Sequence, residues 1–254
     1  MGAESIALIV VNCSDVASLN QGEALRGMRA WGDGPDVEGH RSFASEDVRM
    51  WYLSEHVLSE NYLDRRWFEA TGEPVREVIF PSRHSAASGQ ASLTLHPIGI
   101  PHMPVGELGT YGGIGGRAPP PNSRLAPWWR MLQQRWGNHP ELSNFDLSLE
   151  VTHHGPYLDA PSLFIEVGST ETTWGHMGAA HLLGTIIHDG LFDPSVVTSW
   201  NETEHRDSLV LITLGGGHYA SFANVPAGHD DVWPEHMLAP YALPFVKQDG
   251  VPGG

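Results

Sequence analysis

Short apolar runs alternate with amphipathic stretches along most of the chain. The runs at residues 5–11, 48–53, 75–80, 92–95, 147–151, 162–167 and 208–214 predict strands, several of them continuously apolar and therefore buried on both faces. The stretches at residues 18–31, 61–70, 126–136 and 174–191 predict helices with an apolar side. Because strands alternate with helices, the pattern predicts a three-layer α/β/α fold around a mostly parallel mixed sheet.

Three segments lack such periodicity and are predicted to be irregular. Residues 32–46 form a predicted loop, residues 99–127 a Gly- and Pro-rich loop, and residues 223–254 an irregular tail after a last buried strand. Ser169 and Thr170 are expected to cap the helix that follows them. The length suits a single domain over residues 1–254.

The acidity of the chain changes the expected partners. The chain has 30 acidic and 14 basic residues, which gives a formal net charge of −16. We expect most of this charge to solvate the surface, and it argues against indiscriminate binding to nucleic acids, DNA included, because phosphate contacts need cations. RNA stays compatible with it, since the Debye length is only about 3 Å at about 1 M salt.

Two further features limit the class of protein. No run of about 18 apolar residues occurs, and the first residues lead directly into a strand, so we expect neither a membrane span nor a secretory signal. Cys13 is the single cysteine, which excludes an intramolecular disulfide and a thiolate zinc site. Any metal must therefore take histidine and carboxylate ligands.

Polar side chains with catalytic or metal-binding chemistry follow five of the predicted strands. In open α/β sheets the ligand crevice lies outside the carboxyl ends of the strands, so we expect these groups to meet at one rim. They are Ser82, Arg83 and His84, then His96, then His153 and His154, then Glu166, Ser169 and Glu171, and finally Gly215 to Gly217 with His218. Glu150 and Glu166 accompany the strands at 147–151 and 162–167, which are expected to be neighbours, and buried carboxylates are costly unless paired or ligated.

Two chemistries fit this set of residues. Neutral imidazoles with a carboxylate can hold Zn²⁺, which lowers the pKa of bound water from 15.7 to about 7 and polarises a carbonyl group. Alternatively, a His–Glu pair acts as general base on water without a metal. His153 and His154 are adjacent, so on a regular strand they point to opposite faces and only one serves a given site unless a turn intervenes. The three glycines before His218 would let backbone N–H groups approach a phosphate or a developing oxyanion.

Several motifs, in the same order along the chain, resemble the archaeal and plant type of D-aminoacyl-tRNA deacylase. They are Ser82-Arg83-His84-Ser85, Leu93-Thr94-x-His96, Tyr111-Gly112-Gly113, Glu150-x-Thr152-His153-His154-Gly155-Pro156, Pro161-Ser162-x-Phe164-Ile165-Glu166-x-Gly168-Ser169-x-Glu171-x-x-Trp174 and Gly215-Gly216-Gly217-His218-Tyr219-Ala220. The resemblance covers roughly residues 5–245. It implies hydrolysis of the ester that joins a D-amino acid to the 3′ end of tRNA, which releases free tRNA and the D-amino acid. It also implies a phosphorylase/hydrolase-like fold, a zinc requirement and a cytoplasmic monomer that binds no membrane.

The resemblance shows which residues of this chain match the motifs of the family, but it does not assign a role to each of them. We hypothesise that His84, His154 and Glu166 are catalytic and that His96, His153 and His218 hold Zn²⁺. The hypothesised substrate-binding residues, in chain order, are Ser82, Arg83, Ser169, Glu171, Gly216 and Gly217.

The chain departs from the family pattern in two places. Family members continue for a few dozen residues beyond the segment that matches residues 235–242, and the segment after Gly99 is usually shorter and contains Asn. We therefore expect the first departure to alter tRNA binding, stability or activity, and the second to alter the range of substrates. Two other functions stay open at this point: a zinc amidohydrolase or carboxypeptidase-like hydrolase of small molecules, and a non-catalytic tRNA-binding module.

Overall fold

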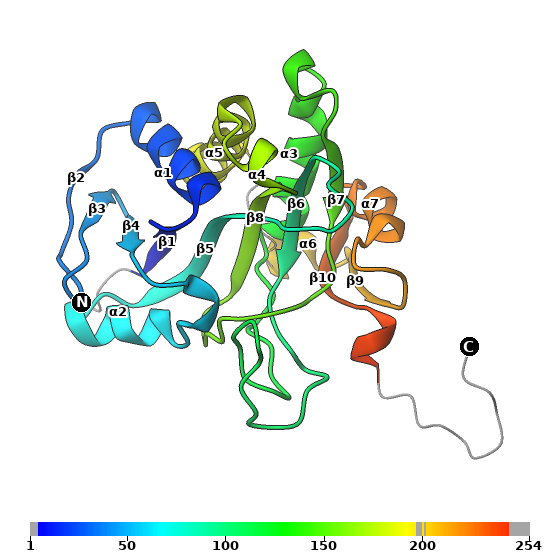
Figure 1. Cartoon of the computed structure of the whole chain (residues 1–254), viewed down its shortest axis with the longest axis horizontal. Helices are drawn as coiled ribbons and strands as arrows, with labels where there is room; N and C mark the ends of the chain where they lie inside the picture. The colour runs from blue at the N-terminus through cyan, green and yellow to red at the C-terminus, as the bar shows by residue number, and fades with distance from the viewer. Residues whose placement is uncertain (1–4, 197–199, 201, 244–254) are drawn as a thin grey trace.

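An eight-stranded sheet dominates the structure, a computed structural model that describes residues 5–196, 200 and 202–243 (Figure 1). The strands lie in the order β2-β3-β4-β1-β5-β8-β6-β7. Their bounds are β1 (Ile6–Asn12), β2 (Gly32–Asp33), β3 (Ser42–Ser45), β4 (Val48–Leu53), β5 (Val75–Arg83), β6 (Ser92–Pro97), β7 (Asp146–Leu149) and β8 (Ser162–Gly168). Strands β4, β1, β5 and β8 run parallel, as do β6 and β7. The prediction of a mostly parallel mixed sheet is confirmed.

Helices cover both faces of this sheet, which gives the predicted three layers (Figure 1). Helices α1 (Val16–Met28), α3 (Leu125–Trp136) and α5 (Met177–Phe192) pack on one face and enclose the larger hydrophobic core. Helix α2 (Leu63–Thr71) packs on the other face over a second core. Every residue of β1 and β8 is buried, which explains why these strands are not amphipathic in sequence.

The shorter helices lie around these layers. They are α4 (Glu171–Trp174), α6 (Glu202–His205) and α7 (Ser221–Ala227), with single 3₁₀ turns η1 (Val57–Ser59), η2 (Pro140–Leu142) and η3 (Pro240–Ala242). The helix predicted at 174–191 corresponds to α5, and a separate short helix, α4, lies between it and the predicted cap. Thr170 caps α4, whereas the side chain of His176 accepts a hydrogen bond from the backbone of Ala179 and caps α5. Within the described residues, none of the helices combines the length and the apolar character needed to cross a bilayer.

The direction of β6 and β7 corrects the predicted arrangement of strand ends. Strand β6 pairs antiparallel with β8, with Thr94 opposite Glu166 and His96 opposite Phe164. The carboxyl ends of β6 and β7 therefore lie at the opposite edge from those of β5 and β8, and a single rim of strand ends does not exist. Strand β6 also separates β7 from β8, so those two strands are not neighbours.

The carboxyl-terminal part of the described chain also differs from the prediction. Strand β9 (Leu209–Leu214) pairs with β10 (Val232–Leu238) in a separate two-stranded sheet. The prediction of a last buried strand is wrong, since Leu209 and Leu214 are 62% and 67% exposed. The prediction of an irregular tail is wrong for β10, and residues 244–254 of that tail lie outside the described residues.

The predicted loop at 32–46 contains the edge strands β2 and β3, which extend the sheet antiparallel to β4. These strands are short and largely polar, so no apolar run marks them. The segment between β6 and α3 is irregular, as predicted, and lies on the same side of the sheet as α2 (Figure 1). Several of its residues line a cavity together with two of the histidines described next.

Candidate active site

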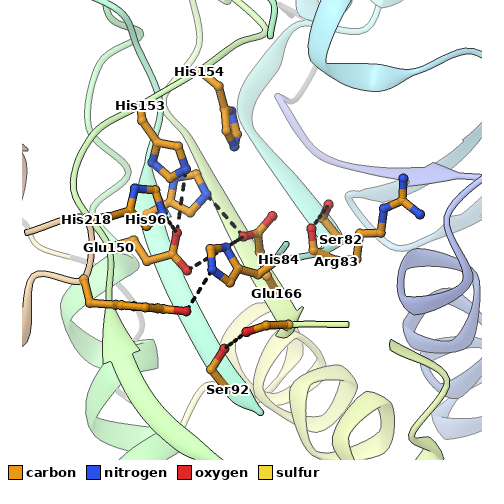
Figure 2. A network of polar contacts seen from close by, with 12 residues as sticks. Ser82, Arg83, His84, Ser92, His96, Glu150, His153, His154, Glu166 and His218 are labelled. Carbon is orange, nitrogen blue, oxygen red and sulfur yellow. Dashed lines mark hydrogen bonds and ion pairs between the residues drawn. The ribbon is translucent and has the colours of Figure 1, made fainter. Parts of the chain in front are cut away.

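Two buried carboxylates lie at the centre of a cluster of five histidines (Figure 2). Glu150 follows β7, is fully buried and contacts three imidazoles from different segments of the chain. Its Oε1 lies 3.1 Å from His84 Nδ1, and its Oε2 lies 3.0 Å from His218 Nε2 and 3.6 Å from His153 Nε2. A hydrogen bond from His218 and the close contact with the imidazole of His84 offset the cost of burying this carboxylate, which would be large for an unpaired charge.

Glu166 on β8 is the second carboxylate and is 3% exposed. Its Oε2 lies 3.6 Å from both His84 Nδ1 and His96 Nε2. Burial acts to raise the pKa of Glu166, but the interactions with His84 and His96 outweigh it and hold the pKa well below the ordinary value. Glu166 is therefore an ionised carboxylate in a nearly dry site.

Three of the imidazoles share one arrangement of ring nitrogens. In each, Nδ1 contacts a backbone carbonyl oxygen: Pro97 O at 3.0 Å for His96, Val151 O at 2.7 Å for His153 and Gly155 O at 2.7 Å for His154. Since a carbonyl oxygen only accepts, Nδ1 carries the proton in the neutral form of each ring, and Nε2 of that neutral ring keeps its lone pair. One nitrogen from each ring lies within 4.8 Å of the others. This arrangement is typical of histidines that bind a metal through Nε2.

The electrostatics of the five histidines divide them into two groups. Burial first, and then the neighbouring imidazoles, lower the pKa of His153 far below its ordinary value and that of His154 to about 3. Both are therefore neutral near pH 7 and are weak bases. Burial acts to lower the pKa of His84 and His96 as well, but Glu166 and Glu150 reverse the effect and raise both.

A left-handed turn at His154 brings the two adjacent histidines to one site. Its φ angle is 41°, a conformation that few residues other than glycine adopt. The ring centroids of His153 and His154 lie 4.2 and 4.9 Å from that of His96. The turn that the sequence left open is therefore present, and both rings serve the same cluster.

A cavity of about 430 Å³ opens onto the cluster and contains most of the predicted site residues. The predicted residues that line it are Ser82, Arg83, His84, His153, His154, Glu166 and His218. Ser82 Oγ donates to Asp15 Oδ2 at 3.2 Å, and Asp15 also accepts from the backbone N–H of Arg83 and of Ala17. Asp15 thereby joins the start of α1 to the end of β5 and fixes the wall of the cavity.

Four of the predicted substrate-binding residues lie away from this cavity. Ser169 is 1% exposed and is hydrogen-bonded to Gln90 O, and Glu171 lies in the exposed first turn of α4. Gly216 and Gly217 do not line the cavity either. A Cβ on Gly216, whose φ is +82°, would lie 2.2 Å from the ring of Phe222, so this glycine serves a tight turn.

Two residues of the cluster were not among the predicted site residues. Glu150 stands in a quoted motif, and its alternation with Leu149 and Val151 already placed it on the face away from those apolar residues. The hydroxyl of Tyr219 lies 3.0 Å from His84 Nε2, and only its position next to His218 hinted at this contact.

Comparison with known proteins gives consistent matches. The family described as D-aminoacyl-tRNA deacylase matches residues 71–251. A D-aminoacyl-tRNA deacylase of Arabidopsis thaliana is 40% identical, and the match covers 94% of this chain and 76% of the relative. A relative with the same name from Methanococcoides burtonii is 31% identical, and the match covers 95% of this chain and 47% of the relative. Another, from Pyrococcus furiosus, is 30% identical, and the match covers 83% of this chain and 71% of the relative. A crystal structure of a conserved protein of unknown function is 25% identical with a TM-score of 0.76, and covers 94% of this chain and 78% of its own.

The nitrogen arrangement predicts the protonation state of His153 and His154 in metal-free protein. Between about pH 7 and about pH 5 both rings should stay neutral with the proton on Nδ1, because burial and neighbouring imidazoles disfavour a second proton. Imidazole ¹⁵N NMR of chelator-treated protein measures both properties, with exposed His181 as the reference ring. A proton on Nε2 of either ring, or a protonation midpoint above about pH 6, would contradict the arrangement.

Proposed function

The chain belongs to the D-aminoacyl-tRNA deacylase family, and we propose that its buried histidine–glutamate cluster is where the ester of D-aminoacyl-tRNA is hydrolysed. The reaction adds water across the ester bond and releases free tRNA and the D-amino acid. One observation carries this proposal: three imidazoles with free Nε2 atoms and two buried carboxylates meet beside a cavity of about 430 Å³. That volume is within the range of about 300–1,000 Å³ that is usual for ligand sites.

We assign His96, His153 and His154 as the residues that would hold a zinc ion. The buried Nε2 of His96 has no hydrogen-bond partner among the described residues, and it faces a carboxylate, so the position favours a cation. Three histidines with a fourth position open to water are a usual ligand set for catalytic zinc. When bound, zinc would lower the pKa of water and polarise the ester carbonyl. This set replaces His218 of the sequence hypothesis with His154, since His218 groups with His84 and Glu150.

His84 and Glu166 then handle the proton. His84 Nδ1 faces both carboxylates, which raise the pKa of the ring against the effect of burial. In the neutral ring, Nδ1–H donates to the carboxylates, and Nε2 accepts a hydrogen bond from the hydroxyl of Tyr219. We assign Nε2 of His84 to accept the proton of the attacking water, which takes the place of the Tyr219 hydroxyl as donor to this nitrogen, and to return the proton to the ribose oxygen when the ester C–O bond breaks.

Other properties of the protein are proposed on the family resemblance alone. They are a hydrolase acting on a carboxylic ester, a single domain, a monomeric state and a cytoplasmic location. The acidic surface adds one expectation, since few phosphate contacts imply that binding of tRNA depends only weakly on salt.

Removing either member of the proton-handling pair should suppress hydrolysis. We expect Glu166→Gln and His84→Ala each to lower kcat/KM for D-Tyr-tRNA by about 10²–10⁴-fold, because general acid–base groups contribute about that much. The assay measures release of D-tyrosine from tRNA, with a free D-tyrosyl peptide as a second substrate to test the small-molecule alternative. His181→Ala, an exposed change on α5, is the matched control. Near-normal rates in both folded site variants would contradict the assignment.

Metal content distinguishes the two ligand sets. The wild-type protein should bind about one zinc per chain, and His154→Ala should lose most of it, because three imidazoles form the site. His218→Ala should keep its zinc, because the ligand atom of His218 groups with those of His84 and Glu150 and not with those of the three proposed zinc ligands. Elemental analysis of dialysed protein measures the content. Zinc retained in His154→Ala and lost in His218→Ala would favour the ligand set predicted from sequence.

A further inference from the structure

A second cavity, of about 310 Å³, also borders the two adjacent histidines. It shares Tyr111, His153 and His154 with the first cavity. Its remaining lining residues are Ile100, His102, Met103, Gly109, Thr110, Gly112 and Tyr241. His153 and His154 therefore border both cavities, which meet at Tyr111 and the histidine turn.

The two cavities differ in chemistry. The first is polar and contains Asn12, Asp15, Arg83 and Glu166 among its lining residues. The second has no acidic, lysine or arginine side chain in its lining, and its walls are mainly aliphatic or aromatic. An ester bound at the histidines would thus have one charged hollow and one largely apolar hollow available for its two halves.

Backbone packing fixes the wall between the cavities. The N–H of Gly155 donates to Tyr111 O at 3.0 Å. Gly112 has a φ of +73°, and a Cβ on it would lie 1.5 Å from Leu58 O, so only glycine permits this approach. On the far wall, the rings of His102 and Tyr241 are in contact, with centroids 5.6 Å apart. The second cavity is therefore bounded by packed segments from several parts of the chain.

Arg83 gives the first cavity a cation. The Arg83 side chain is exposed and lies over the ring of Trp174, with 4.6 Å between the guanidinium carbon and the ring centroid. It forms no ion pair with a carboxylate of the described residues, whereas Arg66, for example, is paired with Glu38 and Glu60. The charge of Arg83 also acts on the carboxyl of Asp15 in the same cavity, but the guanidinium stays exposed and outside ion-pair distance of it, so it can bind a phosphate group.

We propose that the second cavity receives the side chain of the esterified amino acid, while the first receives the terminal nucleotide of the tRNA with its phosphate at Arg83. This inference rests on the proposed function and adds an orientation of the substrate to it. The apolar hollow suits aromatic and large aliphatic side chains, and its size lies near the lower end of the range for ligand sites. The charged hollow suits ribose and phosphate groups.

Filling the second cavity should change the preference among amino acids. Met103 is half-buried in its wall, whereas Val105, in the same loop, is 85% exposed and lines neither cavity. We expect Met103→Trp to lower the ratio of kcat/KM for D-Tyr-tRNA to that for D-Ala-tRNA by about 10-fold or more, in the range that pocket contacts give. Val105→Trp should leave this ratio unchanged. Thr110→Trp, a change at an exposed residue that also lines this cavity, should lower the same ratio. It provides a second test in case Met103→Trp does not fold.

The outcomes separate the orientation from the function itself. Equal losses on both substrates, or an unchanged ratio in both filled variants, would overturn the assignment of the second cavity. Arg83→Met should lower kcat/KM strongly for D-Tyr-tRNA and much less for the phosphate-free ester D-tyrosyl-adenosine. Equal losses of kcat/KM on the two substrates would overturn the placement of the phosphate. If wild-type protein hydrolyses neither D-aminoacyl-tRNA, the proposed function fails before the orientation is tested.

Discussion

The burial of two carboxylates in one place is the constraint on which the rest of the site depends. Glu150 and Glu166 are almost inaccessible to water, and isolated charges in that position would be prohibitively costly. Imidazoles from β5, β6, the segment after β7 and the turn after β9 therefore have to converge on them. Because burial, and then the neighbouring imidazoles, disfavour a second proton on His153 and His154, part of the cluster stays neutral and keeps lone pairs available. The same charge balance that permits burial thus prepares the site for a cation.

The reversed direction of β6 explains how side chains from distant segments meet. Strands β5 and β8 bring His84 and Glu166 toward the cluster from one edge of the sheet. Strands β6 and β7 run the other way and bring His96, Glu150 and the adjacent histidines from the opposite edge. The site consequently lies across the face of β8 instead of beyond one rim (Figure 2), and residues of the irregular segment between β6 and α3 line the second cavity beside it.

Much of the fold was predictable because burial leaves a direct pattern in the sequence. The apolar run of β1, the largely apolar run of β8 and the helical spacing in α5 predicted the layers of these elements correctly. Strand direction leaves no such pattern, since an apolar run looks the same in a parallel and an antiparallel pair, and this is why the rim of strand ends was wrong. The exposure of β9 was missed for a related reason: its Leu, Val and Ile residues resemble those of a buried strand, although solvent covers one side.

The chemistry of the site was predictable as a set of residue types, whereas their grouping was not. Histidines and glutamates near strand ends pointed to the correct segments, but the left-handed turn at His154 decided that it joins His96 and His153. A direct measurement is anomalous diffraction at the zinc edge from crystals grown with zinc. The account predicts one strong peak at about 2.0–2.1 Å from the Nε2 atoms of these three histidines. A map without density there, or with zinc bound only at other groups, would contradict it.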